Sequence, residues 1–230
     1  MHIPACARAL KLPLTLDELA AAGFAPATLP NSRSAAEGTG QVVAITFDDG
    51  PHPEGTPQVL EVLAEHGATA TFFLVGEQVV KRPELAQRIV QEGHAVALHG
   101  YRHIAHPSRS RKQMLEDFDR GTAAIEDATG VTPRLHRPPY GVYSPASLRI
   151  ARERGLQPLL WASWGRDWRK LATPEDITAR VVSHLRAGDV ILLHDADFYS
   201  AVRSHRRTAA ALPMILRMLQ SAELATVAYA

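Results

Sequence analysis

The chain has 230 residues, of which 46% are hydrophobic and 21% are charged, and its formal net charge is +1. This profile is typical of one soluble globular domain with a full core, and the near-neutral charge gives no reason to expect nucleic acid or an anionic membrane as a partner. The single cysteine, Cys6, excludes an intramolecular disulfide and a thiolate metal cluster.

The first 41 residues are interpreted as a lead segment and linker. Charged residues and Pro13 interrupt the apolar runs near the N-terminus before they reach the length of a signal-peptide core. Residues 26–41, PATLPNSRSAAEGTGQ, are rich in Pro, Ser, Gly and Thr. No stretch approaches the roughly 20 apolar residues that span a bilayer. We therefore expect a cytoplasmic protein with no membrane span and one domain over residues 42–230.

From residue 42 onward, short apolar strands alternate with amphipathic helices. Strands are predicted at 42–47, 69–74, 94–98, 134–137, 156–161, 189–193 and 224–228. Helices are predicted at 56–66, 83–92, 110–129, 144–154, 174–185 and 207–222, with Pro83 and Pro174 in first turns and Thr173 as an N-cap. This α/β alternation implies a parallel sheet covered by helices, either open or closed into a barrel. Six or seven strands are fewer than the eight of a complete (β/α) barrel.

Titratable residues follow five of the predicted strands. In chain order, the stretches are DDG (48–50), HGYRH (99–103), RPPYG (137–141), GRDW (165–168) and HD (194–195). Active sites of parallel α/β folds form where the loops after the strands converge. We therefore expect these five stretches to face one site.

A metal site is indicated by His99 and His103, whose i, i+4 spacing brings both imidazoles within reach of one ion. A carboxylate from a neighbouring strand end would complete a set of two histidines and one acid, which suits a catalytic Zn²⁺ or Fe²⁺-type ion. Asp48 and Asp49 are adjacent in an extended segment and so point in different directions. One of them is expected to bind the ion and the other to take a proton from activated water.

An acid for the leaving group is needed on the other side of the reaction. His194, directly after the predicted strand 189–193, is the candidate. Either Asp167 or Asp195 could hold its tautomer and raise its pKa.

The five stretches, in this order, resemble the polysaccharide deacetylase family, also called the NodB-homology or carbohydrate esterase 4 family. The resemblance rests on TFDDGP (46–51), HGYRH (99–103), RPPYG (137–141), GRDW (165–168) and LLHD (192–195), and it spans residue 42 to the C-terminus. It implies a distorted (β/α) barrel with about seven strands. It also implies a divalent metal, Zn²⁺ or a similar ion such as Co²⁺, and an N-acetylated saccharide as substrate.

The resemblance also assigns a role to each residue of the site. It implies that Asp49, His99 and His103 bind the metal, that Asp48 is the general base paired with Arg137, and that His194 is the general acid bonded to Asp167. It further implies that the main-chain N–H of Tyr140 stabilises the oxyanion, and that Trp168 and Leu192 line the pocket for the acetyl methyl.

This chain departs from the family pattern in three respects. Gly100 stands where the family usually has a Ser or Thr that braces the histidine loop, Ala162 and Trp164 stand where it often has acids, and no export signal is evident. The expected activity is metal-dependent removal of N-acetyl groups from an amino sugar, on a small or carrier-linked saccharide. The alternatives are removal of an N-formyl or O-acetyl group, and a non-catalytic, metal-containing sugar-binding module.

Overall fold

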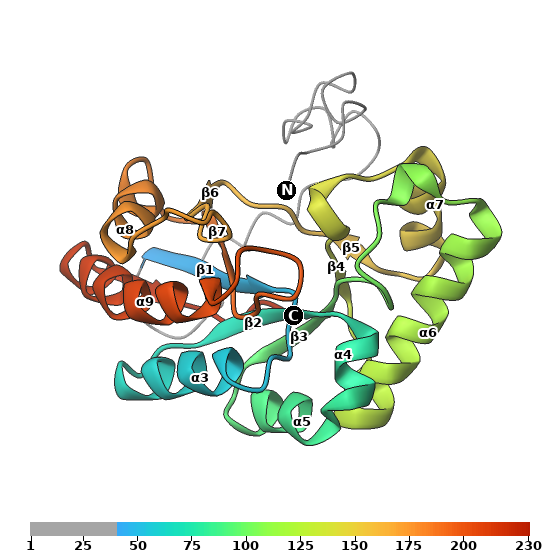
Figure 1. The fold of residues 1–230 in the computed structure, drawn as a ribbon, viewed down its shortest axis with the longest axis horizontal. Helices are drawn as coiled ribbons and strands as arrows, with labels where there is room; N and C mark the ends of the chain where they lie inside the picture. Colours follow the sequence, from blue (N-terminus) through green and yellow to red (C-terminus); the bar gives the residue numbers. More distant parts are fainter. Residues whose placement is uncertain (1–40) are drawn as a thin grey trace.

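The computed structural model describes residues 41–230 (Figure 1). Residues 1–40, which hold almost all of the expected lead segment, lie outside the described part of the chain. The first strand begins at Gln41, one residue before the predicted boundary.

A single parallel sheet forms the centre of the domain. Its strands are β1 Gln41–Asp48, β2 Ala70–Leu74, β3 Ala95–Leu98, β4 Leu135–His136, β5 Gln157–Pro158, β6 Ser163–Trp164, β7 Val190–His194 and β8 Leu224–Thr226. The spatial order is β5-β4-β3-β2-β1-β7-β6, and β8 also pairs with β1. The sheet is an incomplete barrel whose path ends at β5 and β6, which confirms the predicted α/β fold.

Helices surround the sheet on its outer side (Figure 1). They are α3 Gly55–Glu65, α4 Gly76–Lys81, α5 Pro83–Gln91, α6 Arg111–Thr129, α7 Pro145–Glu153, α8 Pro174–Val182 and α9 Ser204–Ser221, with 3₁₀ turns η1 His106–Ser108 and η2 Pro139–Gly141. The Thr173 side chain caps α8 by accepting the N–H of Asp176, as predicted. None of the helices in the described range combines the length and the apolar character needed to cross a membrane.

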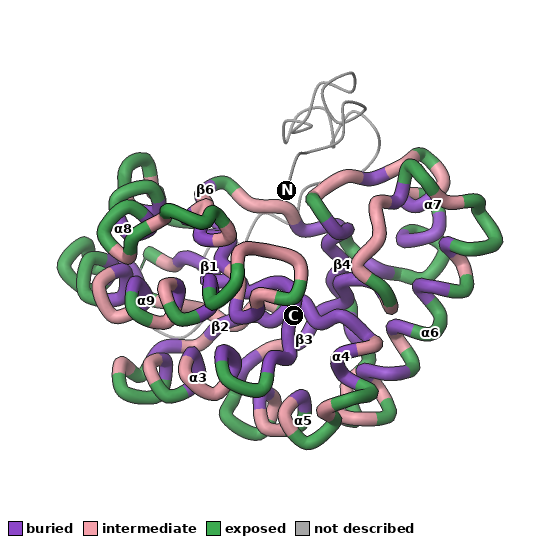
Figure 2. Tube along the Cα trace, viewed as in Figure 1, coloured by how far each residue is buried: buried purple, intermediate pink, exposed green. Residues whose placement is uncertain are grey.

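The central strand β1 is buried on both faces, which lets it serve the core and the site together (Figure 2). Val43, Ile45 and Phe47 belong to the main hydrophobic core. Because side chains alternate along a strand, Thr46 and Asp48 point to the opposite face, toward the inside of the curled sheet. The strand therefore carries polar groups to the site without interrupting the core.

The main differences from the predicted elements concern β5, the unpredicted strand β6 and the unpredicted helix α4. The predicted strand 156–161 is only two residues long as β5, which lies at the edge of the sheet, where a proline such as Pro158 is tolerated. The chain then crosses to the other edge of the sheet, where β6 pairs with β7. The short helix α4 was not predicted, since its six residues are too few for a helical period to be read.

Candidate metal and catalytic site

The parallel register of the sheet brings the candidate base and the candidate acid to neighbouring positions. Asp48 of β1 lies opposite His194 of the neighbouring strand β7. The loops that follow β1 and β3 carry Asp49, His99 and His103 to the same end. The fold therefore places these five residues at one end of the sheet.

Asp49, His99 and His103 form a compact group of possible metal ligands. The Asp49 Oδ1 atom lies 3.4 Å from Nε2 of His99 and 3.2 Å from Nε2 of His103. This oxygen is buried without a hydrogen-bond partner, and Asp49 has a φ of 81°, a left-handed conformation that aspartate rarely adopts. A buried, unpaired carboxylate oxygen facing two imidazole nitrogens fits a divalent cation.

The tautomer of His99 also suits a metal ligand. Its Nδ1 atom lies 2.8 Å from the main-chain carbonyl oxygen of Arg137, which can only accept a hydrogen bond. Nδ1 therefore carries the proton, and the lone pair of Nε2 points toward Asp49. Burial by itself would raise the pKa of Asp49, but the neighbouring His103 holds that pKa well below its usual range. The carboxylate is thus ionised, as a ligand must be.

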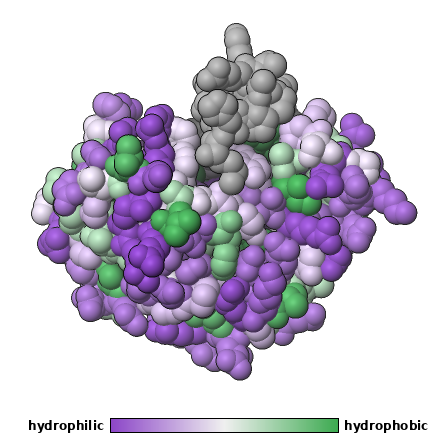
Figure 3. Space-filling view, in the orientation of Figure 1, coloured by the Kyte–Doolittle hydropathy of each residue, from purple (hydrophilic) through white to green (hydrophobic). Residues whose placement is uncertain are grey.

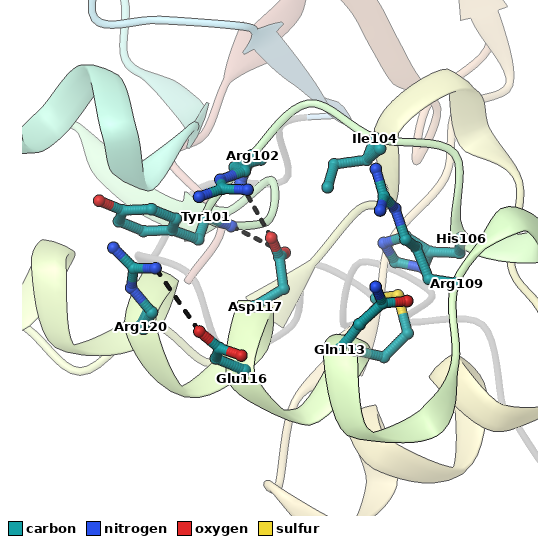
Figure 4. A pocket seen from close by; sticks show the side chains of 10 residues that line it. Tyr101, Arg102, Ile104, His106, Arg109, Gln113, Glu116, Asp117 and Arg120 are labelled. Carbon is teal, nitrogen blue, oxygen red and sulfur yellow. Dashed lines mark hydrogen bonds and ion pairs between the residues drawn. The ribbon is translucent and has the colours of Figure 1, made fainter.

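The loop that carries both histidines is braced from two helices. In α4, the main-chain N–H of Gly76 donates to the carbonyl oxygen of Gly100, and that of Glu77 donates to the carbonyl oxygen of Tyr101. Both hydrogen bonds are 2.9 Å long. From α6, the Asp117 carboxylate accepts the N–H of Tyr101 at 2.9 Å and that of Arg102 at 3.0 Å (Figure 4).

Asp117 also accounts for the glycine in this loop. Gly100 has a φ of +85°, and a Cβ atom there would lie 2.9 Å from the Asp117 Oδ2 atom. A carboxylate from α6 therefore supplies the bracing that was expected from a hydroxyl at position 100. Although Gly100 replaces the usual Ser or Thr of the family, the loop is still supported, in this case from α6.

Replacing Asp117 with Asn should weaken metal binding by about 10-fold or more, because an amide presents one N–H₂ group to a loop that needs two acceptors. Competition with a chromogenic chelator measures the Zn²⁺ affinity. The matched control is Asp119→Asn, on the same helix, where the side chain is 53% exposed and pairs with Arg154. Equal affinities in the two variants would show that the loop does not depend on Asp117.

Asp48 is held by a buried ion pair. Its Oδ1 atom lies 2.6 Å from NH1 of Arg137, whose side chain is fully buried. The same guanidinium group donates to Thr46 Oγ1 and to the carbonyls of Leu159 and Leu160. The other carboxylate oxygen, Oδ2, lies 3.9 Å from Nε2 of His99, beside the candidate metal position. The position of Asp48 suits a base beside the candidate metal position, and Asp49 lies closer to His99 than Asp48 does.

His194 is paired with Asp167, which decides between the two predicted partners. Asp167 Oδ1 lies 2.9 Å from Nδ1 of His194, and Asp167 Oδ2 accepts the main-chain N–H of His194 at 2.7 Å. Asp195 instead accepts a hydrogen bond from the Thr56 hydroxyl. Burial alone would lower the pKa of His194, but the Asp167 carboxylate, together with the charges of Asp49 and Asp48, raises that pKa to about 10.

Replacing Asp167 with Asn should move the alkaline limb of the pH–rate profile to lower pH by about 1–3 units. A general acid acts in its protonated form, so activity is lost as the pH rises through the pKa of His194, and removing the negative charge lowers that pKa. Thr208→Val is the control, because Thr208 donates to the same carboxylate at 2.7 Å and its loss leaves the charge in place. An alkaline limb that moves equally in both variants would contradict this role of Asp167.

The remaining predicted residues border the same site. Tyr140, in η2, has a φ of 62°, and its ring centroid lies 4.6 Å from that of His103. The Trp168 ring packs edge-on against the His194 ring, with centroids 5.3 Å apart. Leu192 is buried on β7, opposite Thr46.

Tyr199 was missed by the sequence analysis. Its ring is stacked on the imidazole of His103 with centroids 4.0 Å apart and an interplanar angle of 7°. Its hydroxyl donates to Glu77 and accepts from Gln78, both in α4. The loop after β7 is therefore tied to the histidine loop. The one sequence signal was an aromatic residue shortly after a strand end that carries His and Asp.

A second group of possible ligands, His52, Asp197 and His205, lies nearby. The Nδ1 atom of His52 accepts main-chain N–H groups from Glu54 and Gly55, so the proton of the neutral ring is on Nε2, which lies 3.2 Å from Asp197 Oδ1. Burial lowers the pKa of His52 and favours that neutral form. His52 therefore donates a hydrogen bond to Asp197 and offers no lone pair to an ion there.

Comparison with known proteins agrees with this geometry. The profile of the polysaccharide deacetylase family matches residues 35–159. A peptidoglycan-N-acetylglucosamine deacetylase of Bacillus cereus is 36% identical over 205 residues, which cover 88% of this chain and 90% of that protein. The chain belongs to the polysaccharide deacetylase family. Another relative, a chitooligosaccharide deacetylase of Bradyrhizobium sp., is 40% identical over 157 residues, or 66% of this chain and 70% of that protein.

Solved structures of carbohydrate esterases share the fold of this family member. A family 4 carbohydrate esterase from Streptomyces lividans, in complex with acetate, matches with a TM-score of 0.73 and 33% identity over 81% of this chain and 91% of that one. A family 4 acetyl xylan esterase from Clostridium thermocellum, with a cobalt ion, matches with a TM-score of 0.75 and 30% identity over 81% and 87% of the two chains. The predicted family and fold are confirmed.

Proposed function

We propose that this polysaccharide deacetylase family member is a metal-dependent hydrolase that removes N-acetyl groups from an amino-sugar-containing saccharide. The observation that carries the proposal is the arrangement of three parts at one end of the sheet. Asp49, His99 and His103 form a ligand set, Asp48 lies beside it on Arg137, and His194 lies opposite on Asp167. A metal that activates water, a base that takes its proton and an acid that protonates the leaving amine are together sufficient for amide hydrolysis.

Asp49, His99 and His103 would hold the divalent ion, for which we propose Zn²⁺, with Co²⁺ able to replace it. A bound ion of this kind lowers the pKa of water to about 7 and polarises the acyl carbonyl. The ligand set of two histidines and one carboxylate leaves positions open for both. The cobalt ion in the Clostridium thermocellum esterase structure supports the choice of a transition metal.

The residues of the chain then divide the proton transfers between them. Asp48, oriented by Arg137, takes the proton of the attacking water, and the main-chain N–H of Tyr140 stabilises the negative charge that develops on the carbonyl oxygen. His194, held by Asp167 through Nδ1, gives the proton of Nε2 to the amine nitrogen as the carbon–nitrogen bond breaks. Trp168 and Leu192 form the wall against which the acetyl methyl group lies.

The choice of acyl group rests on the relatives. One is named as a peptidoglycan-N-acetylglucosamine deacetylase and another as a chitooligosaccharide deacetylase, which favours an N-acetyl group. The acetyl xylan esterase keeps an O-acetyl ester as the second candidate. Rates on matched N-acetyl, N-formyl and O-acetyl sugars separate these activities.

A non-catalytic sugar-binding module is disfavoured by the hydrogen bonds that orient the candidate base and the candidate acid. Arg137 orients Asp48 and Asp167 orients His194 at hydrogen-bond distance. A module that only binds sugar through a metal has no need for an oriented base and acid. Saturable binding of a saccharide without release of acetate would restore that alternative.

Removal of the metal should abolish turnover, and Zn²⁺ or Co²⁺ should restore it. The measurement is acetate release from N-acetylated amino sugars, from monosaccharides to chitooligosaccharides, by chelator-treated protein with and without added metal. Activity of the same protein after dialysis without chelator is the control. Acetate release that persists in the chelated protein would contradict the metal dependence.

A further inference from the structure

A cluster of positive charge lies beside the GRDW segment, outside the residues that carry the chemistry. Arg166, Arg169 and Lys170, from the segment before α8, and Arg180, from α8 itself, line a surface hollow of about 360 Å³. Asp176 is the one acidic residue among those that line it. Figure 3 shows mainly hydrophilic surface in the region of α8 and α9, with isolated hydrophobic side chains.

The charges of this hollow are not neutralised by the part of the chain that the structure describes. None of its four cationic side chains has a described carboxylate within ion-pair distance. The Asp176 carboxylate accepts the N–H of Thr173 at the start of α8. A fifth cation, Arg207 of α9, reaches the carbonyl oxygen of Arg169 at 3.1 Å, and its buried Nε atom has no hydrogen-bond partner. Clustered cations of this kind raise the local concentration of anions.

A row of aromatic rings links this hollow to the candidate acid. The Arg166 guanidinium lies 4.6 Å from the centre of the Trp164 ring, and Arg166 has a φ of 52°, in the left-handed region. The Trp164 and Trp168 rings are 5.3 Å apart, and Trp168 is in turn 5.3 Å from His194. Backbone strain at a non-glycine residue tends to persist at functional positions, and here it holds a cation beside the rings that lead to His194.

We propose that the saccharide substrate carries an anionic group, a carboxylate or a phosphate, and that Arg166 and Arg169 bind this group while the acetamido group lies at His194. Two indole rings between the hollow and the acid provide apolar surface for the intervening sugar. Arginine is suited to this task because its planar guanidinium group binds carboxylate and phosphate oxygens in pairs. The inference rests on the proposed deacetylation and specifies its substrate class.

A nucleic acid is a less suitable source of the anion. The formal net charge of the chain is +1, whereas backbone binding to nucleic acid needs a broad basic surface. The hollow is local and adjoins the catalytic residues. An anion that is part of the substrate therefore explains its place better than a separate polyanion does.

The test compares neutral tetra-N-acetylchitotetraose with the same N-acetylated tetrasaccharide carrying one phosphate or one carboxymethyl group. The wild-type metal-loaded protein should show a higher kcat/KM for the anionic forms. Adding 0.5 M NaCl should reduce this preference, because the Debye length falls to about 4 Å and the charges are screened from each other. Arg169→Gln and Arg166→Gln should each lower the ratio of anionic to neutral kcat/KM by about tenfold. Arg217→Gln, an exposed change on α9, is the matched control.

The outcomes separate the two proposals. Acetate release from all substrates without a preference for the anionic ones would overturn the anionic substrate and leave deacetylation intact. If both arginine variants keep the preference for anionic substrates, the anionic group does not bind at this hollow. No release from any substrate would overturn the proposed function itself. If single-stranded DNA inhibits turnover at micromolar concentration and Arg169→Gln removes that inhibition, the hollow binds a polyanion and not an anionic group of the substrate.

Discussion

Replacing Arg137 with Met should destabilise the protein by about 3–5 kcal/mol, because it leaves the Asp48 carboxylate buried without its partner. Arg137 is completely buried, and its guanidinium group lies 2.6 Å from Asp48 and 3.9 Å from the centre of the Phe73 ring. The side chain also donates to the Leu159 carbonyl at 2.8 Å, an acceptor that the variant would leave unpaired. Urea unfolding of the two proteins measures the difference in free energy.

The matched control for this effect is Arg154→Met. Arg154 forms an ion pair of 2.7 Å with Asp119, but its side chain is 40% exposed, so its loss should cost less than about 1 kcal/mol. If Arg137→Met does not fold, Arg137→Lys keeps the charge and loses the planar fork, and it should show a smaller loss in the same direction. Similar costs for Arg137→Met and Arg154→Met would contradict the structural importance of the buried pair.

Replacing Asp48 with Asn should lower kcat by about 10²–10⁴-fold while leaving metal affinity largely unchanged. The amide fits the same space but cannot take a proton from water. Asp48 is the more distant of the two acids from the histidines, at 3.9 Å from His99 against 3.4 Å for Asp49. Acetate release and Zn²⁺ titration on the same preparation measure the two quantities.

Asp49→Asn is the paired variant for this experiment. It should lose metal affinity first, and its activity should recover in part at high metal concentration. If Asp48→Asn instead loses the metal and Asp49→Asn keeps it, the two acids have exchanged roles. The difference between the variants therefore assigns the base and the ligand independently of the overall rate.

The order of motifs along the chain was enough to predict which residues lie together. Parallel strands place the residues that follow them at one end of a sheet, so the order of DDG, HGYRH, RPPYG, GRDW and HD was enough to predict a common site. The sequence also predicted the helix starts at Pro83 and Pro174 and the N-cap at Thr173. Each of these features depends only on main-chain N–H groups within one helical turn. Spacing and strand ends therefore predicted a group of His99, His103 and one of the two adjacent aspartates, and the family resemblance implied that this aspartate is Asp49.

The partner of each of these residues depends on tertiary packing, and before the fold was known the pairs Asp48–Arg137 and His194–Asp167 rested on the family resemblance alone. The choice of Asp167 over Asp195 for His194 depends on how β6, β7 and α9 pack, and those elements are far apart in sequence. The brace from Asp117 reaches Tyr101 across 16 residues, and Tyr199 reaches His103 from another loop. Such contacts follow from packing between elements and leave no periodic signal along the chain. Local patterns fix elements and their ends, whereas orientation, tautomer and pKa depend on neighbours that only the folded chain brings together.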